Sequence, residues 1–202
     1  MSPVQRANAV IRRIPGWAVY LVGGVLPFWY LYLALTGGLG VEPVNALERA
    51  IGKLAMKALV IVLAITPLRR WTGVNLIPYR RAIGLIAFFY VFCHLLVWAV
   101  LDVQDPGRIW SDIVKRPYIT IGMVAFVLLL PVAITSNNWA IRRLGPLRWR
   151  RLHMLTYVIC ALGAAHYVMV QKVWEVEPLI YLVIVLGLLA VRIPTIRRTL
   201  AG

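Results

Sequence analysis

The stretch from Arg150 to Tyr167 reads RRLHMLTYVICALGAAHY, and it decides the fold class. It is an apolar run of about the length that crosses a bilayer, and it holds two of the chain's three histidines, His153 and His166. The third, His94, lies in another apolar run, FFYVFCHLLVWAV. Ionisable side chains at membrane depth are costly and by default mark a functional site. Because histidine is a common axial ligand of haem iron, we take all three as candidate haem ligands in a bundle of membrane helices.

The composition of the whole chain also favours a membrane protein. Of its 202 residues, 61% are hydrophobic and 14% are charged, whereas soluble domains are about half apolar and about a quarter charged. The net charge of +15 could suit a nucleic acid. However, the basic residues flank apolar runs and form no basic face with interleaved aromatics, so we expect no nucleic-acid partner. The chain lacks the C-x-x-C-H motif of covalent haem attachment.

Six apolar stretches reach, or nearly reach, the roughly 20 residues that span a bilayer. They lie near residues 16–36, 48–67, 82–102, 118–136, 153–172 and 178–194. The predicted fold class is therefore all-α, a six-transmembrane-helix bundle formed by a single domain over residues 1–202. We find no internal repeat, Walker A motif or Rossmann glycine pattern in the sequence, so we expect no nicotinamide-binding domain.

Charged residues alternate between successive connections. Fifteen arginines fall at the two termini and in the second-to-third and fourth-to-fifth connections. All seven acidic residues fall on the opposite side: Glu42, Glu48, Asp102, Asp105, Asp112, Glu175 and Glu177. The positive-inside rule then predicts that both termini are cytoplasmic.

This topology gives each histidine a depth. His94 lies twelve residues after the predicted helix start at Ala82, or about 18 Å at 1.5 Å per residue. His166 lies thirteen residues after His153, or about 20 Å. Two histidines at one level on two helices can give an iron both axial ligands. Thirteen residues leave His153 and His166 about 140° out of alignment, so they share a face only with tilt or a local change in winding.

An arginine occupies the level below His94. Arg80 precedes His94 by fourteen residues, about 40° off alignment, at the predicted depth of His153. A guanidinium group is a good bidentate partner for a flavin phosphate or a haem propionate, and Arg81 lies beside it. Plainer alternatives stay open: Arg80 and Arg81 as topology anchors, His153 as an interfacial residue, and the buried histidines as hydrogen-bonded core residues.

Short matching stretches along the chain carry a family resemblance. They are Leu26-Pro27-Phe28, Gly37-Gly38-Leu39-Gly40 with Pro43-Val44, Ile65-Thr66-Pro67-Leu68, Arg80-Arg81 with Gly84-Leu85, His94-Leu95, Arg116-Pro117-Tyr118, Arg143-Leu144-Gly145, Leu152-His153, His166-Tyr167 and Pro178-Leu179-Ile180-Tyr181. Together they run from about residue 20 to 190, nearly the whole chain. The pattern resembles the MsrQ (YedZ) family of haem-binding membrane subunits, a branch of the ferric-reductase-like transmembrane superfamily.

The resemblance implies a specific function. His94, His153 and His166 match the family's haem b-associated histidines, and Arg80 and Arg81 match an arginine pair linked to flavin mononucleotide (FMN). An electron-transfer subunit is implied, in the bacterial inner membrane, with no catalytic residues of its own. It would take electrons from the quinone pool or a cytosolic flavin reductase. It would pass them to a periplasmic, molybdopterin-dependent methionine sulfoxide reductase subunit, its partner in a heterodimer that repairs oxidised periplasmic proteins.

The residues alone leave a different class of function open. Buried histidines can also form the relay of a proton or metal transporter. Transporters usually show broken helices or paired repeats, and all the acidic residues here are predicted to lie outside the bilayer. A purely structural subunit is a third alternative.

Overall fold

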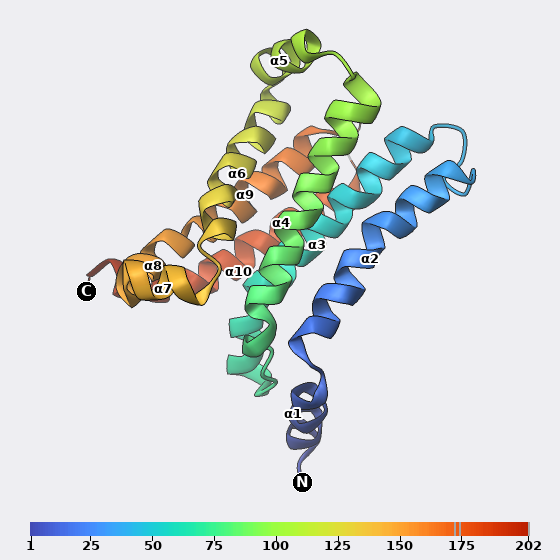
Figure 1. Ribbon diagram of the computed structural model, residues 1–202. Coiled ribbons are helices and arrows are strands. Elements are labelled where there is room, and N and C mark those ends of the chain that lie inside the picture. The colour runs from blue at the N-terminus through green and yellow to red at the C-terminus, as the bar shows by residue number, and fades with distance from the viewer. Residues whose placement is uncertain (172, 174, 202) are drawn as a thin grey trace. The chain divides into compact units, whose positions relative to one another are not determined.

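The computed structural model describes residues 1–171, 173 and 175–201, and every regular element in them is a helix (Figure 1). Residues 172, 174 and 202, and the side chains of Arg197 and Arg198 used in the topology argument, lie outside the described part. Six described segments are long and apolar enough to cross a membrane: Gly16–Leu35, Pro43–Thr72, Ile77–Val103, Pro117–Ile134, Pro146–Met169 and Val176–Ile193. The all-α class and the six predicted spans are thus confirmed, while the sidedness of the termini stays a prediction.

The second and fifth spans differ most from their predicted bounds. The second, α3, runs over Pro43–Thr72 because Pro43 suits the first turn and Gly73, with φ +79°, forms a left-handed C-cap. The fifth begins at Pro146, not at His153. Its first part, α8 (Pro146–His153), carries several arginines. Because these residues are charged, the hydrophobicity of the sequence does not indicate this helix.

Three short helices lie outside the predicted spans, one in the N-terminal segment and two in connections. They are α1 (Pro3–Arg13), α5 (Pro106–Lys115) and α7 (Asn138–Leu144). They are too short or too polar for a hydropathy pattern to show. The sequence does carry a signal for α1, because Ser2 and Gln5 form a reciprocal capping box at its start.

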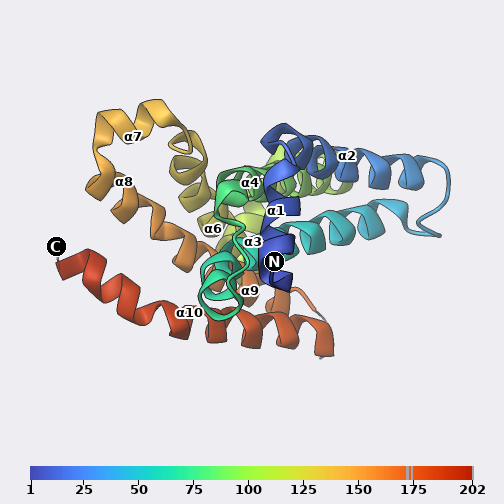
Figure 2. The ribbon, with the colours of Figure 1, turned by 90° about the horizontal axis from the view of Figure 1, so that it is seen from below.

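Residues 1–106 form one compact unit. It contains α1, α2 (Gly16–Leu35), α3, the 3₁₀ turn η1 (Ile77–Tyr79), α4 (Arg80–Leu96) and the π-helix η2 (Val97–Val103). Helices α2 and α3 run side by side and are joined by a tight loop (Figures 1 and 2). The most extensive helix pairing of this unit is between α3 and α4, and its core includes Leu47, Ile51 and Ala87.

A proline in α2 explains how this helix is held on α4. Pro27 lacks an N–H, so the carbonyl of Gly23, four residues earlier, loses its helical hydrogen bond. The buried Tyr90 hydroxyl of α4 donates to that carbonyl at 2.7 Å. Gly23 also packs directly against Ile86, where a Cβ would approach to 2.6 Å. In a bilayer, where water cannot satisfy a freed carbonyl, such a partner is required.

Residues 107–202 form the second compact unit. Helix α6 (Pro117–Ile134) pairs with α9 (Leu155–Met169), and α10 (Val176–Ala201) packs on α9. Cys160 and Ala164 are fully buried between these helices. The outer face of α10 instead exposes large apolar side chains, including Val183, which is 69% exposed. Such a surface suits lipid contact, because lipid tails are as apolar as these side chains.

Candidate functional site

His94 lies near the end of α4 and is oriented by α3. Its Nδ1 lies 3.0 Å from the backbone carbonyl oxygen of Glu48. A carbonyl oxygen only accepts, so Nδ1 donates and carries the proton. In the neutral ring the lone pair is then on Nε2. The π-helix η2 begins three residues further on, at Val97, and such wide turns often occur beside functional sites.

His166 is oriented in the same way within the second unit. Its Nδ1 lies 2.7 Å from the backbone carbonyl oxygen of Tyr118, in the first turn of α6. The same chemistry places the proton on Nδ1 and the lone pair on Nε2. A histidine that binds a metal almost always donates its other ring N–H to such a group. His94 and His166 therefore both fit the role of axial ligand through Nε2.

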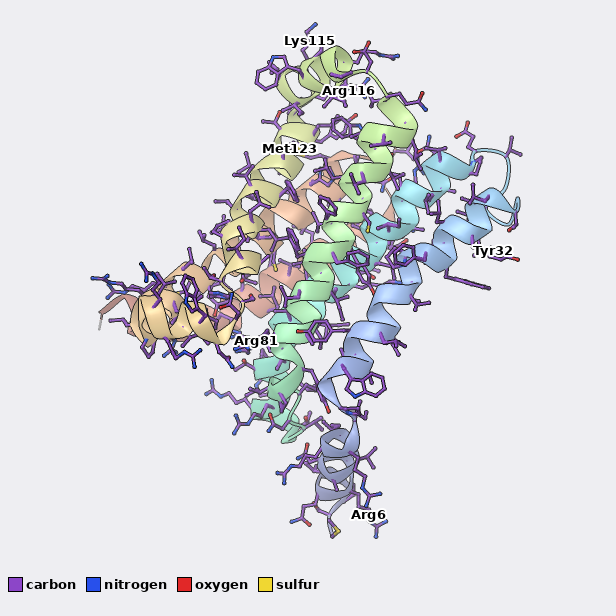
Figure 3. All side chains as sticks on the ribbon, in the orientation of Figure 1. Arg6, Tyr32, Arg81, Lys115, Arg116 and Met123 are labelled. Carbon is purple, nitrogen blue, oxygen red and sulfur yellow. The ribbon has the colours of Figure 1, made fainter. Side chains whose placement is uncertain are left out.

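A glycine lies under each of these rings. A Cβ added to Gly52 would lie 3.2 Å from Nδ1 of His94, and one added to Gly122 would lie 2.9 Å from Nδ1 of His166. Both glycines follow the accepting residue by four positions. In an α-helix the carbonyl of residue i faces residue i+4, so a glycine there leaves the carbonyl open to a second donor. Met123, labelled in Figure 3, follows Gly122 on α6.

His153 is held differently. Its Nε2 lies 3.0 Å from the Thr135 hydroxyl, which itself donates to the carbonyl of Pro131 at 2.6 Å. A hydroxyl has one proton to donate, so His153 Nε2 is the donor here and the neutral ring has its lone pair on Nδ1. The ring also stacks on Trp149 at 3.9 Å. In this arrangement His153 could ligate a metal through Nδ1, the opposite nitrogen from the other two histidines.

The helical winding changes between His153 and His166. Their thirteen-residue spacing needs such a change if the two side chains are to lie on one face. Helix α8 ends at His153 and α9 begins at Leu155. Tyr157 N–H donates to the Met154 carbonyl, a bond over three residues rather than four. This local tightening lies at the start of the apolar run.

The two arginines at the start of α4 have different surroundings. The Arg80 guanidinium donates to the Thr66 hydroxyl of α3, whereas Arg81 is exposed. Figure 3 labels Arg81 at this end of α4. Arg80 therefore packs against its own unit while Arg81 presents its charge outward.

Four residues of this arrangement were not predicted as site residues: Gly52, Gly122, Thr66 and Thr135. A glycine inside an apolar helix is itself a signal, since it costs helix stability and usually has a packing reason. The triplet Ala-Ile-Thr also occurs twice, ending at Thr66 and at Thr135. Both signals were available, but only contacts show which side chain each residue supports.

The three histidines thus lie in, or at the end of, helices of the predicted membrane spans. Comparison with known proteins shows which proteins have a similar sequence. Residues 50–164 match the family described as Ferric reductase like transmembrane component. The chain is therefore of the ferric reductase-like class, and it is a multi-pass membrane protein.

Individual relatives identify the family to which the chain belongs within this class. The protein-methionine-sulfoxide reductase heme-binding subunit MsrQ of Brucella anthropi is 47% identical over 178 residues, 88% of this chain and 80% of that protein. The MsrQ proteins of Brucella ovis and Brucella suis are 46% identical over the same length and with the same shares. The chain belongs to the MsrQ family, which confirms the resemblance seen in its sequence. No solved structure matches it.

Proposed function

We propose that this chain is a b-haem electron-transfer subunit of a protein-methionine-sulfoxide reductase system. Its relatives are named as heme-binding subunits of such a reductase. The observation that carries the proposal is the matched orientation of His94 and His166, each donating from Nδ1 to a helix carbonyl. When bound, haem supplies an iron that changes valence by one electron. The chain holds the ligand rings in one tautomer and surrounds them with apolar helices.

We propose that His94 and His166 form the axial pair of one haem. Support for the pairing comes from their similar predicted depth and from the orientation of each ring by a bond from Nδ1 to a helix carbonyl. We assign His153 to a second, inner level on the cytoplasmic side, where its stacking on Trp149 and its bond to Thr135 fix the ring.

Arg80 and Arg81 are proposed to bind an anionic cofactor group at this inner level. The group is the phosphate of FMN or a propionate of haem. A guanidinium group can hold either through two parallel hydrogen bonds. The support is the position of the pair: Arg80 is the first residue of α4, and Arg81 is exposed beside it.

The partners follow from the family. We propose that electrons enter from the quinone pool or from a cytosolic flavin reductase, and leave to a periplasmic, molybdopterin-dependent catalytic subunit that reduces methionine sulfoxide. The names of the relatives, which call them subunits of a reductase, support such an assembly. We propose the bacterial inner membrane as the location, with both termini in the cytoplasm.

Cofactor content tests this proposal. Protein purified in detergent from haem-replete cells should be red, give a pyridine haemochrome of b type, and release flavin on extraction. A colourless preparation without haem would contradict the proposal and favour a histidine relay in a transporter. A red preparation without flavin would support the haem proposal and contradict the proposal that the chain binds FMN.

A further inference from the structure

The helix pairs α3/α4 and α6/α9 hold their histidines with the same three groups. In each pair, the first helix offers a backbone carbonyl and, four residues later, a glycine, while the second helix offers the histidine. The groups are Glu48, Gly52 and His94 in one pair, and Tyr118, Gly122 and His166 in the other. The agreement extends to the ring atoms, because Nδ1 and Cε1 are the nearest to the glycine in both cases.

The similarity continues at a second level. In each pair a threonine follows the glycine, within α3 (Thr66) or as the C-cap residue of α6 (Thr135), and its hydroxyl bonds a side chain that precedes the histidine. The second-level contacts are Thr66 with Arg80 and Thr135 with His153. The glycine-to-threonine spacings are fourteen and thirteen residues, and the spacings on the partner helices are also fourteen and thirteen. The two helix pairs therefore match at two levels, and in this comparison Arg80 is the counterpart of His153.

We propose that Gly52 and Gly122 are positioning residues that set the orientation of His94 and His166 toward haem, an inference that rests on the proposed function. A Cβ at either position would contact the ring at Nδ1 and Cε1, and Nδ1 is the atom that donates to the carbonyl. Without one, the ring edge can rest on the helix backbone and Nδ1 can reach the carbonyl. Both the tautomer and the rotation of the ring then depend on the missing Cβ.

The distances predict unequal sensitivity at the two positions. A Cβ at Gly122 would lie 2.9 Å from Nδ1 and 3.0 Å from Cε1 of His166, so the ring must move. A Cβ at Gly52 would lie 3.2 Å and 3.3 Å from the same atoms of His94, so a shift of a few tenths of an ångström suffices. Gly122→Ala should therefore perturb the haem more than Gly52→Ala.

The test compares these two variants with two matched controls. Gly24→Ala on α2 and Gly187→Ala on α10 place the same methyl group where nothing lies within 4 Å. All four variants are purified in detergent, their monodispersity is checked, and haem retention and the low-spin electron paramagnetic resonance (EPR) signal of the ferric protein are measured. Changes around a metal ligand typically cost 10- to 100-fold in metal affinity. We expect roughly 10-fold weaker haem retention and shifted g-values in Gly122→Ala, smaller changes in Gly52→Ala, and none in the controls.

His94→Ala and His166→Ala, measured alongside, separate this inference from the proposed function. If the histidine variants lose the low-spin signal while both glycine variants keep wild-type g-values and haem retention, the positioning role is wrong and the function stands. If the histidine variants also keep the signal, the proposed ligands are wrong. If a glycine variant does not fold, the remaining glycine variant decides.

Discussion

At the residue scale, Thr135 determines which nitrogen of His153 carries a proton. Thr135→Val removes the oxygen that accepts from Nε2, so the ring should lose its fixed orientation. We expect electron transfer into the haem from the cytoplasmic side to slow by roughly 10-fold, as for other groups behind a ligand. Thr135→Ser, which keeps the hydroxyl, should stay close to wild type. Stopped-flow haem reduction measures this, and a wild-type rate in Thr135→Val would show that electron entry does not depend on this hydrogen bond.

Arg80 tests whether the inner level binds an anion. Arg80 lies fourteen residues before His94, about 21 Å along the helix, too far to act on an iron that His94 binds. Arg80→Ala should therefore slow haem reduction by a cytosolic-side donor and lower flavin content, while the static low-spin spectrum stays. Arg80→Lys should restore function only in part, because an ammonium keeps the charge but not the bidentate geometry. Normal rates with full cofactor content in Arg80→Ala would make Arg80 a topology anchor only.

At the element scale, the contact of α2 with α4 depends on the carbonyl that Pro27 leaves without a helical partner. Tyr90→Phe removes the hydroxyl that donates to Gly23 and should lower the free energy of unfolding by about 1 kcal/mol. In a Pro27→Ala background, the restored N–H satisfies that carbonyl, so the same change should cost clearly less. Thermal unfolding in detergent measures the cycle. If Tyr90→Phe lowers the free energy of unfolding equally in both backgrounds, the hydroxyl does not replace the hydrogen bond that Pro27 removes.

The elements also show what the sequence could predict. The hydrophobicity of long runs predicted all six spans, since apolar length is what a bilayer requires. The start of the fifth span was wrong because α8 carries arginines within helical turns. The similarity of the two histidine-bearing helix pairs was not detected in the sequence, because the matching groups are two backbone carbonyls, two glycines and two hydroxyls. Which of these groups lies beside a histidine depends on helix packing, and the periodicity of the sequence gives no information about that packing.

At the scale of the whole molecule, the segregation of charges predicts cytoplasmic termini. All seven acidic residues fall on one predicted side and fifteen arginines on the other. A single cysteine introduced at Pro146 should react only with a membrane-permeant reagent, and one at Gly107, in the predicted outer connection, with an impermeant reagent added from the periplasm. Strong periplasmic labelling at position 146 would reverse the topology.

The candidate haem ligands could be predicted by type but not by arrangement. Three histidines in apolar helices are rare enough to single out, and the family of the chain is confirmed, while the role of these histidines stays a prediction. Their tautomers could not be predicted, because these depend on which carbonyl or hydroxyl a neighbouring helix presents. His94 and His166 donate from Nδ1, whereas His153 donates from Nε2. This difference is what separates the proposed outer pair from the inner level.

The main proposal is that His94 and His166 ligate the same iron. The most direct measurement is the low-spin ferric EPR signal of purified wild type, His94→Ala, His166→Ala and His153→Ala. A shared iron predicts that the same bis-histidine signal disappears in both His94→Ala and His166→Ala, because either change leaves that iron with one axial ligand. His153→Ala should keep it. Survival of the signal in either of the first two variants would contradict the claim.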